Sequence, residues 1–164
     1  MTWPHLHLML NHVPVLGAVF GFLLLAYGVW RKNETLQRAA LWSFAIVALA
    51  AVPVYLTGEP AEEAVEHLAG TGTQMIEAHQ EAALVSLIAI ELLGVVALAT
   101  LWLARGPWMR RAMNATLAIA FATVGLMAWT ANLGGQIRRP ELRQAATGQQ
   151  QGEADEGDHE DGRP

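Results

Sequence analysis

Histidines gather in one short stretch near the start of the chain. The segment HLHLMLNHVP contains His5, His7 and His12, which are three of the six histidines in 164 residues. A neutral imidazole can ligate a transition metal or a haem iron, and the ring also titrates near neutral pH as a proton relay or sensor. Histidine can equally rest at a membrane surface because it has an apolar body and a polar tip. The stretch alone leaves these three uses open.

Two further histidines lie beside acidic residues in the middle of the chain. His67 directly follows Glu66, His79 lies two residues after Glu77, and His159 stands apart near the C-terminus. These spacings match neither the zinc motif H-E-x-x-H nor the Glu-x-x-His pair of ferritin-like di-iron proteins. The absence of cysteine excludes disulfides, thiolate zinc sites, iron–sulfur clusters and covalent c-type haem attachment.

Imidazoles on separate helices, without a thiolate, fit a b-type haem held by two histidines. His12 and His79 are the first candidate pair because each lies at the mouth of an apolar stretch, and His7 with His67 is the second. A mononuclear site for a divalent transition metal such as zinc, copper or iron is the competing interpretation. Its candidate ligands are His5, His7, His12, Glu66 and Glu77.

Four long apolar stretches must position these side chains. About 20 mostly apolar residues in a helix cross the hydrocarbon core of a bilayer, and the helix satisfies its own backbone hydrogen bonds there. The expected spans are residues 13–30, 39–57, 82–103 and 112–132. The third helix is expected to begin earlier than its apolar part, near Thr73, whose hydroxyl can cap it.

The predicted fold class is all-α, an integral membrane four-helix bundle over residues 1–138. A short helix is expected between the second and third spans, since Pro60 suits a first helical position and an amphipathic run follows it. Residues 139–164 are acidic, and no large apolar residue follows Gln144. This composition predicts a disordered tail.

The basic residues of the first 135 positions fall in two short connections between the expected spans. They are Arg31, Lys32, Arg38, Arg105, Arg110 and Arg111. Positive charge marks the cytoplasmic side, so both termini and the acidic segment 58–81 are expected on the periplasmic side of a bacterial inner membrane. Arg138, Arg139 and Arg143 beyond the fourth span oppose this orientation, and the two connections outweigh them.

Glu91 lies near the middle of the third expected span, in the run LIAIELLGV. An ionisable side chain at that depth is costly, and a functional role is the default hypothesis. Glu91 could relay protons or hydrogen-bond a neighbouring helix, with Thr123 as a possible partner at similar depth. The sequence leaves both roles open.

The segment HLMLNHVPVLG resembles the opening of the DUF2231-like family of small four-span bacterial membrane proteins, with His7, His12 and Pro14 at matching positions. Leu8 and Val13 depart from the family's Pro and Phe. The segment ANLGGQIRRPE, residues 131–141, is similar to the Gly-Gly segment after the last span of such proteins. The resemblance implies a four-span layout and a setting near respiratory proteins, and it ranks His7 and His12 first.

The leading hypothesis is a haem b protein that moves electrons near the periplasmic face. Its acidic outer segment and tail would attract a basic soluble redox protein by electrostatic steering. The alternatives are a non-catalytic accessory subunit of a larger membrane complex and a metal-binding or proton-linked membrane protein. The chain has no basic face for a nucleic acid, and its expected surroundings are membrane lipid.

Overall fold

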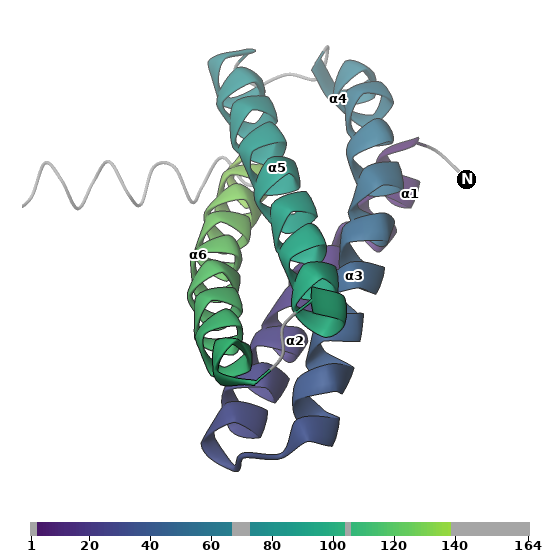
Figure 1. Ribbon diagram of the computed structural model, residues 1–164. Coiled ribbons are helices and arrows are strands. Elements are labelled where there is room, and N and C mark those ends of the chain that lie inside the picture. Colours follow the sequence, from purple (N-terminus) through teal and green to yellow (C-terminus); the bar gives the residue numbers. More distant parts are fainter. Residues whose placement is uncertain (1–2, 67–72, 104–105, 139–164) are drawn as a thin grey trace, which may run out of the picture.

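The computed structural model describes residues 3–66, 73–103 and 106–138. Within these ranges the chain forms helices and no strands, which confirms the all-α fold class (Figure 1). The helices are α1 (Trp3–Leu10), α2 (His12–Trp30), α3 (Glu34–Leu56), α4 (Gly58–Glu66), α5 (Thr73–Leu103) and α6 (Pro107–Arg138). The predicted disordered tail and His67 lie outside the described residues.

Four helices are long and apolar enough to cross a membrane, as predicted. They are the continuous stretch of α1 and α2, then α3, α5 and α6. Three of the spanning helices, α3, α5 and α6, begin before the apolar stretch expected for them. The start of α3 illustrates this, because the Asn33 side chain accepts a hydrogen bond from the Leu36 amide at 3.1 Å and caps the helix five residues before the expected span. The protein is therefore a multi-pass membrane protein.

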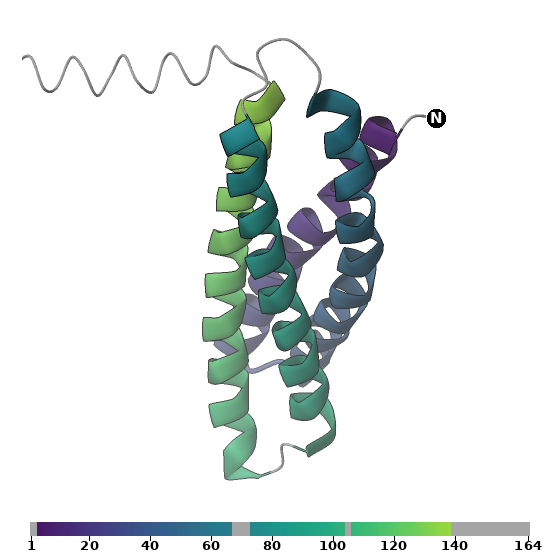
Figure 2. The same cartoon turned by 90° about the horizontal axis from the view of Figure 1, so that it is seen from above.

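The four long helices form a ring in the order α2, α3, α5, α6, each packing against its neighbours. The contact between α2 and α6 closes the ring and is the least extensive of the four. Figure 2 shows α5 and α6 side by side along their length. The short helix α1 packs against α4 and α2, so it belongs to the α2–α3 side of the bundle.

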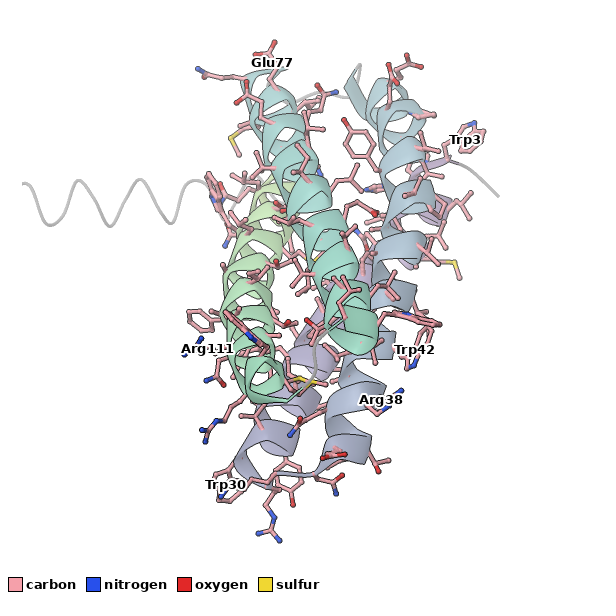
Figure 3. The ribbon with its side chains drawn as sticks, viewed as in Figure 1. Trp3, Trp30, Arg38, Trp42, Glu77 and Arg111 are labelled. Carbon is pink, nitrogen blue, oxygen red and sulfur yellow. The ribbon has the colours of Figure 1, made fainter. Side chains whose placement is uncertain are left out.

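The two ends of the bundle differ in charge. We call the end with the α2–α3 and α5–α6 connections the arginine end, and the end with α1, α4 and the start of α5 the histidine end. Figure 3 shows Trp30 and Arg38 toward the arginine end and Glu77 at the histidine end. The exposed acidic side chains of the histidine end are Glu59, Glu63, Glu77 and Glu81. The predicted short helix between the second and third spans is present as α4.

Glycines allow the closest helix contacts. A Cβ atom added at Gly17 would lie 2.5 Å from Cγ2 of Val47, and one added at Gly94 would lie 2.6 Å from Cβ of Ala48. Helices in a bilayer approach closely where small residues face each other. The small residues of α2 and α3 therefore allow neighbouring helices to pack closely. Ala48 is the point at which α5 packs against α3.

Most of the remaining surface of the long helices is apolar. Between about a quarter and a half of the side chains in each spanning window are buried inside the bundle. Large exposed apolar side chains include Leu16, Phe20, Leu23, Ile46, Leu49, Ile88, Leu92 and Val95. A helix that is apolar all round, in so small a bundle, is typical of a membrane span.

Candidate cofactor site at the histidine end

His79 lies in the second turn of α5, half-buried against α6. Its Nδ1 atom is 3.2 Å from the carbonyl oxygen of Thr130. A carbonyl oxygen can only accept, so Nδ1 carries the hydrogen and donates it, and Nε2 keeps the lone pair. Gly134, one turn beyond Thr130, makes room for the ring, since an added Cβ there would lie 3.0 Å from Cε1 of His79.

Thr130 also connects the two helices through its side chain. Its hydroxyl oxygen is 2.8 Å from the Ser86 hydroxyl and donates to the Ala82 carbonyl at 3.0 Å. The same residue therefore holds the His79 ring through its main chain and holds α5 through its side chain. This network fixes the position of His79 relative to α6.

Thr130 is the last of three threonines spaced by seven along α6. Thr116 bonds to the hydroxyl of Thr100 on α5 at 3.2 Å, whereas Thr123 donates only to the Ile119 carbonyl of its own helix at 2.9 Å. A spacing of seven keeps side chains on one seam of a left-handed helix pair. This spacing of seven is the sequence signal that identifies Thr130 as a residue of the α5–α6 interface.

His12 lies in the first turn of α2, and its side chain is exposed. Its Nδ1 atom is 2.7 Å from the carbonyl oxygen of Leu8 in the last turn of α1, where carbonyls lack the usual main-chain partners. As in His79, the carbonyl requires a hydrogen on Nδ1, so in a neutral ring Nε2 is the nitrogen that has the lone pair. The His12 ring thus spans the break between α1 and α2.

His7 fastens α1 to the end of α3. Its Nδ1 atom lies 3.1 Å from the Val54 carbonyl oxygen and 3.3 Å from the Thr57 hydroxyl, which itself donates to the Val54 carbonyl at 2.8 Å. Thr57 caps α3 just after Pro53, through which the helix continues. Its partner in the second predicted haem pair, His67, lies outside the described residues, so that pair stays a prediction.

The predicted metal ligands do not form a cluster in the part of the chain that the structure describes. His5 is exposed on α1, whose main contacts are with α4 and α2, and Glu77 is exposed at the start of α5. Across residues 3–66, 73–103 and 106–138, no three or more His, Cys, Asp or Glu side chains are placed to hold a metal ion. The side chain of Glu66 lies outside this description, so a site that depends on it is untested.

Glu91 has no partner for one of its carboxyl oxygens. Oε1 is buried and makes no hydrogen bond with any described residue. Thr123, the partner considered from the sequence, donates its hydroxyl hydrogen to Ile119 instead. The hydrogen bond to Thr123, which the sequence left open as one role of Glu91, is therefore not made by Oε1.

Comparison of the chain with protein-family models, with curated proteins and with solved structures finds no match. The proposed function therefore rests on the geometry of the residues described above.

Proposed function

We propose that this multi-pass membrane protein holds a b-type haem at its histidine end, where His12 and His79 would hold the iron. The observation that carries the proposal is that both imidazole rings make the same kind of hydrogen bond. In each, Nδ1 donates to a main-chain carbonyl, so Nε2 is the ligand atom. Histidines that bind metals usually donate their other ring nitrogen in this way, which fixes both the tautomer and the ring orientation.

The two rings come from different parts of the bundle. His12 lies where α1 meets α2, and His79 lies between α5 and α6. A six-coordinate haem needs one imidazole on each face, whereas a zinc or copper site needs three or four convergent ligands. Two histidines on separate helices, with no cluster of three among the described residues, favour haem over a mononuclear metal site.

The residues around His79 suit a ligand that must stay in place. The Thr130 carbonyl orients the ring, and the absence of a side chain at Gly134 gives the ring its space. The haem would supply a one-electron couple, and the protein's part is to hold the imidazoles and exclude water. Apolar side chains surround the bundle below this level, so electrons would enter and leave at the histidine end.

Charge supports an orientation in a bacterial inner membrane with the histidine end on the periplasmic side. Five basic residues lie at the other end, as the positive-inside rule expects, and they outweigh Arg138 at the end of α6: Arg31, Lys32, Arg38, Arg110 and Arg111. The exposed acidic side chains at the histidine end would attract a basic periplasmic redox protein. The resemblance of residues 7–17 to the DUF2231-like family supports the same layout, and we propose membership of that family.

An absorption spectrum tests the haem proposal. The protein is purified in detergent from cells supplied with a haem precursor and is measured oxidised and dithionite-reduced. We expect a Soret band with sharp reduced α and β bands, lost in His12→Ala and His79→Ala. His5→Ala is the matched control, since it removes an exposed imidazole of the same end and should keep the spectrum.

Three outcomes overturn the assignment. Full haem in both ligand variants would show that other residues hold it. A blank spectrum with near-stoichiometric zinc, copper or iron would identify a metal site instead. A blank spectrum with co-purification of a larger membrane complex would identify an accessory subunit.

A further inference from the structure

Glu91 lies far from both ends of the membrane-spanning part of α5. Ten residues separate it from Glu81 and twelve separate it from Leu103, the last residue of the helix. At a rise of 1.5 Å per residue these separations are roughly 15 and 18 Å along the helix axis. The carboxyl group is therefore near the middle of the hydrocarbon layer.

The side chain sits at the boundary between the bundle core and the lipid-facing surface. Its neighbours Ile90 and Leu93 are completely buried, whereas Leu92 is 54% exposed. Gly94, three residues further on, packs against Ala48 of α3, and residues three apart share a side of a helix. Glu91 therefore lies on the α3 side of α5, with one carboxyl oxygen buried and the side chain still partly accessible from outside the bundle.

No charged side chain among the described residues shares this depth. Apart from Glu91 itself, the titratable residues with described side chains on α5 and on the helices that pack against it lie near the helix ends: Glu34, Arg38, Tyr55, Glu59, Glu63, Glu77, His79, Glu81, Arg110 and Arg111. The carboxyl group thus has neither a counter-ion nor a hydrogen-bond donor in the described bundle. An unpaired carboxylate at this depth is costly.

We propose that Glu91 is a proton-binding site within the membrane, open to the lipid phase. A proton is the one ligand that a single carboxyl group can bind without help, because Ca²⁺ or Mg²⁺ requires several oxygen ligands. A role as a hydrogen bond between helices would require a partner, and Oε1 has none among the described residues. A leucine would fill the same position at lower cost, so the carboxyl group calls for a role, and proton binding is the role that needs no partner.

A hydrophobic carbodiimide tests this site. The protein in liposomes is treated with N,N′-dicyclohexylcarbodiimide, which partitions into the bilayer. The carboxyl proton passes to a carbodiimide nitrogen and a carboxyl oxygen bonds to the central carbon. Migration of the acyl group to nitrogen then leaves an N-acylurea with no atom lost. We expect one adduct, mapped by fragmentation of the wild-type chain to residue 91 and lost in Glu91→Gln.

Glu77→Gln is the matched control, because it removes an exposed carboxyl from the same helix and should keep the adduct. The infrared spectrum gives a second readout: a carbonyl band of a protonated carboxyl that shifts in D₂O and is lost in Glu91→Gln. Absence of an adduct at residue 91, or of that band, overturns the proposal. Neither readout depends on haem, so this proposal and the haem proposal can fail separately.

Discussion

The two helical hairpins of the bundle, α2–α3 and α5–α6, are both antiparallel pairs of apolar helices, yet different contacts hold them together. In the first, glycines of α2 receive apolar side chains of α3, as Gly17 receives Val47 and Gly21 receives Phe44. In the second, hydroxyl groups bond across the interface, as Ser86 does with Thr130. Close packing of side chains against glycines holds the first hairpin together, and hydrogen bonds between hydroxyl groups hold the second.

The kind of contact in each hairpin matches the way in which that hairpin holds its histidine. His7 rests on the end of α3, where the helix terminus offers the Val54 carbonyl, so no special side chain is needed inside the α2–α3 interface. His79 reaches a carbonyl within a continuous helix, and the polar seam of α5–α6 supplies the alignment that it needs. Lipid provides no hydrophobic drive for helix association, so each hairpin must obtain its affinity from close packing or from hydrogen bonds.

The largest expected effect comes from filling the glycine side of the α2–α3 hairpin. A Cβ atom at residue 21 would lie 2.6 Å from Cε1 of Phe44, which is completely buried and cannot move aside. We expect Gly21→Leu to destabilise the protein by about 3 kcal/mol, the upper part of the overpacking range. The thermal denaturation midpoint in detergent should fall by roughly 6–12 °C.

Gly125→Leu is the control for that change. Gly125 lies in the middle of α6, is exposed, and has no atom within 4 Å of an added Cβ. Its substitution adds the same apolar side chain without forcing two helices apart, so the midpoint should not fall. Equal losses in both variants would mean that the glycines of α2 have no special packing role.

Sequence reasoning predicted the architecture well because the membrane imposes it. Apolar length and charge placement are properties of each segment alone, so the four long helices could be predicted from the chain one stretch at a time. The contacts around the histidines depend on how helices far apart in sequence meet. Nothing near His79 in the chain indicates that Thr130 and Gly134 lie against it.

Two residues show where the limit lies. The spacing of seven that links Thr130 to Thr123 and Thr116 is visible in the sequence, but the sequence does not say which of these hydroxyls bond across the interface. The depth of Thr123 in its span is the one property that makes it a possible partner of Glu91 in the sequence. Depth can be read from sequence, whereas the rotation of a helix about its axis is set by packing.

A smaller effect is expected from removing the hydrogen bonds between α5 and α6 that involve the Thr130 hydroxyl. Thr130→Val keeps the shape of the side chain and removes the bonds to the Ser86 hydroxyl and the Ala82 carbonyl. Hydrogen bonds of this kind between membrane helices contribute about 0.6 kcal/mol on average and up to about 1.7 kcal/mol. We expect destabilisation within that range, measured by denaturation in detergent.

Thr123→Val is the control for Thr130→Val, because it removes a threonine hydroxyl that makes no bond across the α5–α6 interface. The Thr123 hydroxyl bonds only within α6, to the Ile119 carbonyl, so its loss should change the midpoint little. If Thr123→Val destabilised the protein as much as Thr130→Val, bonds across the interface could not be the source of the difference between the hairpins.

The smallest expected effect on stability comes from two adjacent glycines near the end of α6, and it is the most specific for the site. An added Cβ at Gly134 would lie 3.0 Å from Cε1 of His79, whereas one at Gly135 would have no atom within 4 Å. Alanine is the better helix former by about 1 kcal/mol, so Gly135→Ala should be neutral or slightly stabilising. Gly134→Ala gains the same helix propensity but must displace the His79 ring by a few tenths of an ångström.

We therefore expect Gly134→Ala to keep its thermal midpoint while weakening haem retention and altering the reduced α band. Gly135→Ala should leave both haem retention and the α band unchanged. Indistinguishable spectra in the two variants would show that the position of the His79 ring does not matter for the cofactor, and that the α5–α6 hairpin aligns its helices for some purpose other than holding a ligand.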